Sequence, residues 1–164
     1  MNIQKVMVIG AGQMGSGIAQ VCAQAGYEVK LNDREEKFFD RGFQTISKNL
    51  SRNVEKGRMT EDDKQAVLNK ISKSLSINDA NDVDLVIEAV VENMEIKQSI
   101  FKQLDAIAPA HAILATNTSS LPITEIAAAT NRPEQVIGMH FMNPVPVMKL
   151  VEIIRGLATN DEVY

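Results

Sequence analysis

A glycine-rich turn between an apolar strand pattern and a helix pattern limits the possible folds of this chain more than any other feature. The turn is Gly10-Ala-Gly12-Gln-Met-Gly15, and the four residues before it are all apolar. In such a turn the first glycine permits the tight bend, the second lets the backbone approach a pyrophosphate, and the third lets helix and strand pack closely. The free amide groups at the start of the helix favour a phosphate. The sequence therefore predicts a nucleotide site at this turn.

An acidic residue at the end of the next strand pattern indicates which nucleotide would bind. Asp33 follows the strand pattern at 27–31 and suits both hydroxyls of an adenosine ribose. Its carboxylate repels a 2′-phosphate, which favours NAD. The neighbouring Arg34 would favour that phosphate, so NADP is the minority alternative, and we interpret Arg34 as a solvated side chain. The expected cofactor contacts at this end are Gly10, Gly12, Gln13, Met14, Gly15 and Asp33.

Strand and helix patterns alternate along most of the chain. Strand patterns are found at 5–9, 27–31, 84–87, 112–115 and 136–139, and helix patterns follow Gly12, Asn93 and Pro122. Apolar residues at 39, 43, 46, 50 and 54 predict a long amphipathic helix that stops at Gly57, and Thr60 starts a second helix. The order predicts a Rossmann-type α/β fold: a doubly wound, mostly parallel sheet with a helical hairpin inserted at about 36–70 and an edge strand at 71–75. Ligands of such sheets bind at the carboxyl ends of the strands.

Length and composition exclude several classes of protein. With 164 residues, one domain spanning 1–164 is expected. The formal net charge of −4 argues against a nucleic-acid partner, and no apolar run approaches the roughly 20 residues of a membrane helix. The single cysteine, Cys22, cannot form an intrachain disulfide, which favours a cytoplasmic location. One cysteine and two distant histidines predict no metal site.

The segment from His140 to Glu152 contains the candidate catalytic residues. His140 closes the strand pattern at 136–139, and an apolar run after a turn with two prolines leads to Glu152. A lone histidine is more often a satisfied core residue, but a strand end in a nucleotide-binding sheet favours a functional role. Histidine titrates near neutrality, so it can accept a hydroxyl proton while hydride leaves the same carbon. Glu152 would orient the ring if the proline turn folds the strand back, and is otherwise a solvated strand residue.

Two serines follow the strand pattern at 112–115, in the segment Asn117-Thr-Ser119-Ser120-Leu-Pro. A serine before Leu-Pro is a usual helix start, so helix capping is the first interpretation. Two adjacent serines allow one to cap and the other to face a ligand. The second histidine, His111, precedes a strand in polar surroundings, and we interpret it as solvated.

Four segments carry a resemblance to a known family: 8–20, 86–92, 117–121 and 140–152. They resemble, in the same order and over nearly the whole chain, the N-terminal domain of the L-3-hydroxyacyl-CoA dehydrogenase family. The likeness is greatest to the bacterial members of that family that act on 3-hydroxybutyryl-CoA. The segments at 117–121 and 140–152 are far more specific than the glycine turn. Met142 stands where the family more often has an aromatic residue, and we expect only a packing difference from it.

The resemblance implies an activity and a set of site residues. The reaction would be the reversible, NAD(H)-dependent interconversion of (S)-3-hydroxyacyl-CoA and 3-oxoacyl-CoA. His140 would be the general base paired with Glu152, and Ser119 would bind the substrate oxygen. The family's further NAD contacts correspond to Glu92, Lys97, Asn117 and Asn143.

A basic stripe on the predicted long helix has two interpretations. Arg41, Lys48, Arg52 and Lys56 are spaced seven, four and four residues apart, so they share a face opposite the phenylalanines. On general grounds this is a solvated face. In the family the helical arm touches coenzyme A, and the resemblance implies that Asn49, Arg52 and Lys56 bind the acyl-CoA substrate.

The family's chain continues beyond the length of this sequence into an all-helical domain that closes the active site and forms a homodimer. We therefore expect this chain to bind NAD, to turn over acyl-CoA poorly, and to expose an apolar patch where that domain would pack. Two alternatives stay open. A non-catalytic NAD-binding module would have no use for Ser119, His140 and Glu152, and a dehydrogenase of a free 3-hydroxy acid would not need the basic stripe.

Overall fold

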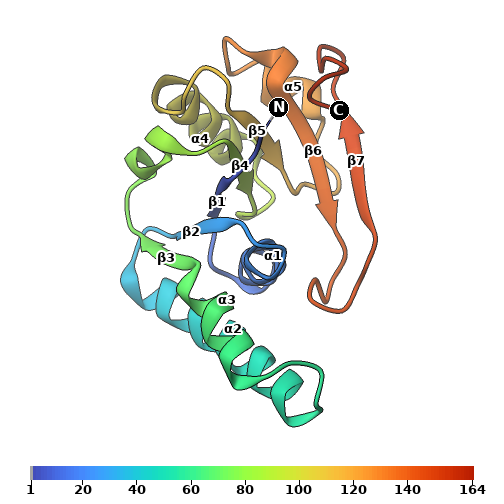
Figure 1. The fold of residues 1–164 in the computed structure, drawn as a ribbon. Helices are drawn as coiled ribbons and strands as arrows, with labels where there is room; N and C mark the ends of the chain where they lie inside the picture. The colour runs from blue at the N-terminus through green and yellow to red at the C-terminus, as the bar shows by residue number, and fades with distance from the viewer. Residues whose placement is uncertain (1) are drawn as a thin grey trace.

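The computed structural model describes residues 2–164, which form one seven-stranded sheet with helices on both faces (Figure 1). The strand order is β3-β2-β1-β4-β5-β6-β7, and all neighbouring pairs are parallel except β6 and β7. The strands are β1 Lys5–Ile9, β2 Glu28–Asn32, β3 Ile71–Ser74, β4 Leu85–Glu88, β5 Ile113–Thr116, β6 Val136–Phe141 and β7 Val151–Arg155. The predicted doubly wound, mostly parallel sheet is confirmed, and its winding reverses between β1 and β4.

The helices cover the two faces of the sheet and create two cores. They are α1 Gln13–Gln24, α2 Glu36–Glu55, α3 Glu61–Asn69, α4 Met94–Ile107 and α5 Ile123–Ala127, with short 3₁₀ helices η1 Ile77–Asp82 and η2 Pro133–Gln135. The central strand β1 shows the division, since Val6 and Val8 join the core under α1, α2 and α3, whereas Met7 and Ile9 join the core under α4 and α5. Alternate side chains of a strand point to opposite faces, so a sheet covered on both sides needs apolar residues at every position.

Three glycines in and after the turn from β1 to α1 occupy positions where a side chain would be strained or would not fit. Gly10 has a φ of +104°, a conformation that favours glycine. A Cβ atom at Gly15 would lie 1.6 Å from the carbonyl oxygen of Gly10. At Gly17 it would lie 2.8 Å from Cβ of Val145, in the connection between β6 and β7. The glycines therefore let α1 approach both β1 and the last hairpin of the chain.

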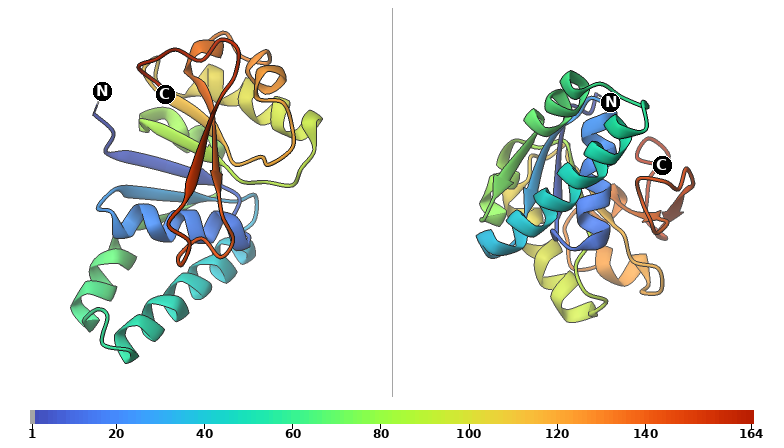
Figure 2. Two further views of the ribbon diagram at one scale, coloured as in Figure 1. Left: turned by 90° about the vertical axis from the view of Figure 1, so that its right-hand side faces the viewer. Right: turned by 90° about the horizontal axis from the view of Figure 1, so that it is seen from below.

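The predicted helical hairpin consists of α2 and α3 and projects away from the sheet (Figure 2). At its base α2 buries Phe39, Ile46 and Leu50 in the core shared with α1. The connection contains Gly57 at a φ of +71°, in agreement with its predicted place at the end of the helix. Thr60 caps α3 as expected, because its hydroxyl accepts from the amide of Asp63 while the Asp63 carboxylate accepts from the amide of Thr60.

The interpretation of His111 as a solvated residue needs correction. His111 lies at the end of the sheet where the parallel strands begin, opposite the glycine turn. His111 is exposed, but it is not merely solvated, since its Nε2 lies 2.8 Å from Oδ1 of Asp84. The other oxygen of Asp84 accepts from the backbone amides of Gln4 and Lys5, at 2.9 and 3.0 Å. Asp84 thus joins the starts of β1, β4 and β5. The hydrogen bond with His111, and then those with the two amides, lowers the pKa of Asp84 from 3.8 to about 2.

We expect the Asp84→Asn variant to lose about 1–2 kcal/mol of unfolding free energy at pH 7, after allowance for solvent screening at this partly exposed site. The lowered pKa of Asp84 means that its contribution is complete above its unfolded value of 3.8 and is lost as the pH falls toward about 2. Urea unfolding at pH 7 and at stepwise lower pH should show the two proteins converging below about pH 5. A difference that does not change with pH would contradict the electrostatic origin.

Candidate active site

A cleft of about 910 Å³ opens at the carboxyl ends of β1, β2 and β4, where the winding of the sheet reverses. The glycine turn and the end of β2 form one wall, and apolar side chains from the β4–α4 connection and α4 form the other. The lining residues used below are Gly10, Gly12, Gln13, Asp33, Arg34 and Arg41, with Val91, Ile96 and Ile100 opposite. Open α/β sheets bind their ligands at this position.

The phosphate end of the cleft lies at the start of α1. Gly12 is the N-cap residue, no side chain caps the first turn, and a Cβ atom at Gly12 would meet nothing within 4 Å. This space and the unpaired amide groups fit a pyrophosphate. Met14 and Gly15 are not among the lining residues of the cleft in the described part of the chain. Gly15 is buried against Gly10, so it has a packing role in the turn, and its contact with the cofactor stays a prediction.

Asp33 lies at the ribose end of the cleft. Its Oδ2 accepts from the amide of Ala11 at 2.9 Å, and its Oδ1 accepts from the amide of Arg34 at 2.7 Å. These bonds tie the end of β2 to the glycine turn and hold the carboxylate at the cleft. The Arg34 guanidinium carbon lies 5.4 Å from the centre of the Phe38 ring, within cation–π range. Arg34 is exposed to solvent, as the sequence predicted, and its guanidinium group lies near the Phe38 ring beside the cleft.

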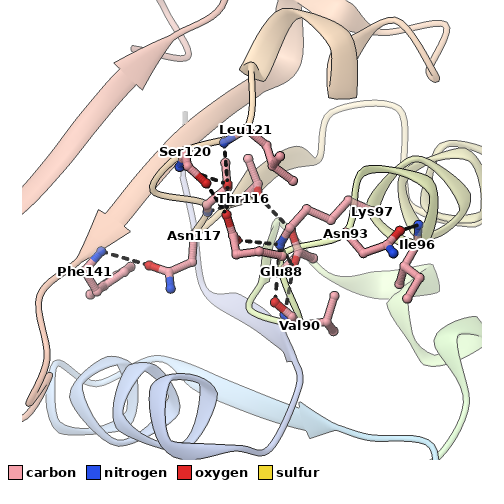
Figure 3. Close-up of polar contacts among 12 residues, drawn as sticks. Glu88, Val90, Asn93, Ile96, Lys97, Thr116, Asn117, Ser120, Leu121 and Phe141 are labelled. Atoms are coloured by element: carbon pink, nitrogen blue, oxygen red, sulfur yellow. Dashed lines mark hydrogen bonds and ion pairs between the residues drawn. The ribbon is translucent and has the colours of Figure 1, made fainter.

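A buried ion pair lies at the end of β4, and sequence reasoning assigned no role to one of its members (Figure 3). Lys97 reaches from α4 to Glu88, with 2.6 Å between Nζ and Oε2, and neither side chain is more than 1% exposed. Glu88 also accepts from the hydroxyl of Thr116 at 2.7 Å and from the amide of Val90 at 2.7 Å. The sequence did contain a signal for this pair, since Glu88 ends a strand that is otherwise apolar. A buried charge needs a partner, so an acid at such a position indicates a nearby cation.

Glu92 connects this ion pair to the loop after β5. Its Oε1 lies 3.3 Å from Nζ of Lys97, and its Oε2 accepts from the hydroxyls of Thr118 at 2.6 Å and Ser120 at 3.0 Å. Burial raises the pKa of Glu92, but the bonds from Thr118, Ser120 and Lys97 outweigh burial and leave the pKa below its usual 4.5. Glu92 is therefore a carboxylate at neutral pH.

The loop after β5 differs from the helix cap that its serines suggested. The N-cap of α5 is Pro122, without a side-chain cap, and the backbone amides of Ser120 and Leu121 point to the hydroxyl of Thr118. Threonine, buried and one position earlier, thus organises the loop in place of a serine. Ser119 is exposed, so it is free to face a ligand.

Asn117 and Asn143 link the loop after β5 to the hairpin of β6 and β7. Asn117 Oδ1 accepts from the amide of Phe141 at 2.9 Å, which fixes the end of β6 beside this loop (Figure 3). Asn143 Oδ1 accepts from Nε2 of Gln13 at 3.2 Å, across to the start of α1. The predicted residues around the strand ends are therefore connected to one another and to the cleft.

His140 and Glu152 are directly opposed in the antiparallel pair of β6 and β7. The proline-rich turn folds the chain back as the sequence required, and Nδ1 of His140 lies 3.3 Å from Oε1 of Glu152. The His140 side chain is 25% exposed and that of Glu152 is 53% exposed. Opposed residues of an antiparallel pair share one face, so the carboxylate holds one ring nitrogen and leaves the other available.

The basic stripe is exposed along α2 and its end: Arg41, Lys48, Arg52 and Lys56 all reach solvent. Asn49 differs from them, because it is half-buried and donates to Oε1 of the buried Gln20 at 3.2 Å.

None of the helices in residues 2–164 is long and apolar enough to span a membrane. The same residues contain no group of three or more His, Cys, Asp or Glu side chains that could hold a metal ion.

The sheet, the glycine turn and the cleft define a dinucleotide-binding α/β domain. The chain belongs to the 3-hydroxyacyl-CoA dehydrogenase family and matches its NAD binding domain over residues 5–164. The cofactor is NAD, in agreement with the prediction made from Asp33.

The chain is similar to bacterial enzymes over almost its full length. It is 58% identical over 162 residues to the probable 3-hydroxybutyryl-CoA dehydrogenase of Bacillus subtilis (strain 168), covering 99% of this chain and 56% of that protein. The crystal structure of (S)-3-hydroxybutyryl-CoA dehydrogenase PaaH1 from Ralstonia eutropha superposes with a TM-score of 0.96 at 46% identity. That match covers 99% of this chain and 57% of the PaaH1 chain. The 3-hydroxyadipyl-CoA dehydrogenase of Escherichia coli (strain K12) is 44% identical over 99% of this chain and 34% of its own length. The chain thus spans about half the length of the first two relatives.

Proposed function

We propose that this chain is the NAD-binding and proton-transferring domain of an enzyme that interconverts (S)-3-hydroxyacyl-CoA and 3-oxoacyl-CoA, with 3-hydroxybutyryl-CoA as the favoured substrate. The observation that carries the proposal is the pairing of His140 with Glu152, 3.3 Å apart at the end of β6, beside the Ser119 loop and the NAD cleft. Membership of the family and the names of the relatives support the substrate class.

In the proposed chemistry the two ring nitrogens of His140 have different roles. In the neutral ring the Nδ1–H group of His140 donates a hydrogen bond to the Glu152 carboxylate, which leaves Nε2 without a proton and able to accept one. During oxidation Nε2 takes the proton of the substrate 3-hydroxyl, and the Glu152 carboxylate stabilises the resulting imidazolium. The exposed hydroxyl of Ser119 donates to the same substrate oxygen as the C=O bond forms. NAD, when bound, supplies the hydride acceptor.

Contacts with the cofactor are proposed for the residues that surround the cleft and the loop after β5. Gly12 and Gln13 at the start of α1 would hold the pyrophosphate, and Asp33 the adenosine ribose. Around the nicotinamide end we propose contacts from Glu92, Asn117 and Asn143, with the buried Lys97 holding Glu92 in place.

Recognition of coenzyme A is proposed for the exposed basic face of α2. Arg52 and Lys56 present cationic groups to solvent at the far end of the arm, and phosphate groups are the natural partners of such side chains. The side-chain amide of Asn49 already donates to Gln20, which holds it between α1 and α2. Asn49 is therefore less available to the substrate than Arg52 and Lys56. The proposal for CoA therefore depends mainly on the two charged residues.

A homodimer in the cytoplasm is the proposed state of the protein in which this domain acts. Exposed large apolar side chains gather on the β6–β7 connection, on β7 and just beyond it: Val147, Met148, Leu150, Ile153, Ile154 and Leu157. Ile153 and Ile154 are neighbours on β7 and point to opposite faces, so apolar surface is exposed on both sides of this edge strand, and another domain or subunit would cover part of it.

The direct test measures NADH oxidation with acetoacetyl-CoA. The chain is assayed alone and with the C-terminal region of the Bacillus subtilis relative, which the match does not cover, added separately or fused. We expect weak turnover alone and higher turnover with that region. Intact NADH binding without turnover in either case would favour a non-catalytic NAD-binding module. Turnover of free acetoacetate that CoA does not inhibit would favour a dehydrogenase of free 3-hydroxy acids.

Replacing Asp33 by Ser should shift the cofactor preference toward NADP. The variant loses a charged acceptor for the ribose hydroxyls, so its Kd for NADH should rise about 10–100-fold. Its Kd for NADPH should fall relative to that for NADH, because Arg34 and Arg41 line the same cleft. Titration of the nicotinamide fluorescence of both cofactors measures the two constants. An unchanged ratio would show that Asp33 does not select the cofactor, and Asp40→Ser, an exposed acid on α2, is the control.

A further inference from the structure

We propose that the buried Glu88, acting through Lys97 and Glu92, positions Ser119 for its bond to the substrate oxygen. The inference rests on the proposed function, which gives Ser119 that role. Glu88 itself is fully buried and is not among the residues lining the cleft, so it would be a positioning residue rather than a catalytic one.

Glu88 and Lys97 hold each other in one arrangement. Glu88 is fixed by three donors: Nζ of Lys97, the amide of Val90 and the hydroxyl of Thr116. These donors come from α4, from the β4–α4 connection and from β5. A buried charge without its partner is strongly unfavourable, so the carboxylate and the ammonium are expected to stay together.

Lys97 also forms an ion pair with Glu92. An ammonium group has three donors. Two of them are directed to Oε2 of Glu88 at 2.6 Å and to the carbonyl oxygen of Val90 at 3.3 Å. Oε1 of Glu92 lies 3.3 Å from the same Nζ and forms an ion pair with it. The buried pair therefore fixes a carboxylate that is itself 43% exposed at the mouth of the site.

Glu92 is in turn connected to the loop that carries Ser119. One oxygen, Oε2 of Glu92, accepts from the hydroxyls of Thr118 and Ser120, the two neighbours of Ser119. The Thr118 hydroxyl in turn accepts from the amide of Leu121 at 3.0 Å. The residue between the two anchored positions is exposed to solvent. Ser119 thus projects from a loop whose two adjacent side chains are held by a single carboxylate oxygen.

The test removes both buried charges together, since a single change would leave a charge unpaired and endanger folding. The variant Glu88→Gln/Lys97→Met is compared with Asp105→Asn/Arg132→Met. This control removes another largely buried pair, 2.8 Å between Nε of Arg132 and Oδ1 of Asp105, far from the loop after β5. Each variant is made with and without Ser119→Ala. The readouts are amide hydrogen exchange of residues 117–121 and kcat at saturating NADH.

We expect the amides of Ser120 and Leu121 to exchange at least about tenfold faster in Glu88→Gln/Lys97→Met and at the wild-type rate in the control. In the first background kcat should fall about 10–100-fold and Ser119→Ala should add little, whereas in the control background Ser119→Ala should keep its full effect. Unchanged exchange, or a full additional effect of Ser119→Ala, would overturn the proposal. If the wild-type chain shows no turnover even with the added C-terminal region, the proposed function fails separately, and exchange alone decides whether Glu88 orders the loop.

Discussion

The His140→Gln variant is expected to lose about 10³-fold in turnover of acetoacetyl-CoA and NADH, within the range that general acid–base catalysis contributes. Glutamine cannot carry the proton that Nε2 of His140 is proposed to exchange with the substrate oxygen. His140 is not among the residues lining the NAD cleft, so the Kd for NADH should change little. Steady-state rates and nicotinamide fluorescence measure the two effects on one preparation.

The chain contains its own control for this variant. His111 is the only other histidine and lies at the opposite end of the sheet, so His111→Gln should keep full turnover. Glu152→Gln should cost on the order of 10- to 100-fold, less than the loss of the base itself, because the half-exposed carboxylate is partly replaced by solvent. Equal rates in His140→Gln and wild type would remove His140 from the mechanism.

The Gly15→Ala variant is expected to lose about 3 kcal/mol or more of unfolding free energy. It should also no longer bind NADH measurably. The added methyl carbon would lie 1.6 Å from the carbonyl oxygen of Gly10, so the first turn of α1 has to move away from β1. That movement would displace the amide groups that are proposed to bind the pyrophosphate. Chemical unfolding and NADH titration are the measurements.

Gly12→Ala separates the two effects. A Cβ atom there meets nothing within 4 Å, and the φ of −73° suits any residue, so the unfolding free energy should change by less than about 1 kcal/mol. The methyl group would occupy space needed for the pyrophosphate, so the Kd for NADH should rise at least about tenfold. A stable Gly15→Ala protein with normal NADH binding would show that the turn tolerates a wider separation of helix and strand.

Much of the fold follows from patterns that act over short distances along the chain. Apolar runs ended by glycine, proline or polar residues predicted the strands, and the spacing of Phe39, Ile46 and Leu50 predicted the long helix. The steric requirement of the glycine turn and the acid at Asp33 were sufficient to predict a dinucleotide site. These features are readable because backbone geometry and side-chain period are local properties.

The sequence does not show which way each side chain near the site faces. Met14 and Gly15 lie within the turn, yet neither is among the residues lining the cleft and Gly15 packs against Gly10, so their contact with the cofactor stays a prediction. A serine was expected to cap α5, yet the threonine before the pair holds the loop. A residue's neighbours in sequence do not reveal which side of a turn its side chain faces.

The sequence by itself determined the class of fold, the place of the nucleotide and the two residues proposed for proton transfer. Only the tertiary structure decided that β7 runs antiparallel in a register that opposes His140 and Glu152, because pairing between strands depends on the whole hairpin. It also decided that Glu88, Lys97 and Glu92 form one chain of contacts ending beside Ser119. Their charges come close and interact strongly only when β4, β5 and α4 have packed together and excluded water. No local sequence pattern encodes that packing.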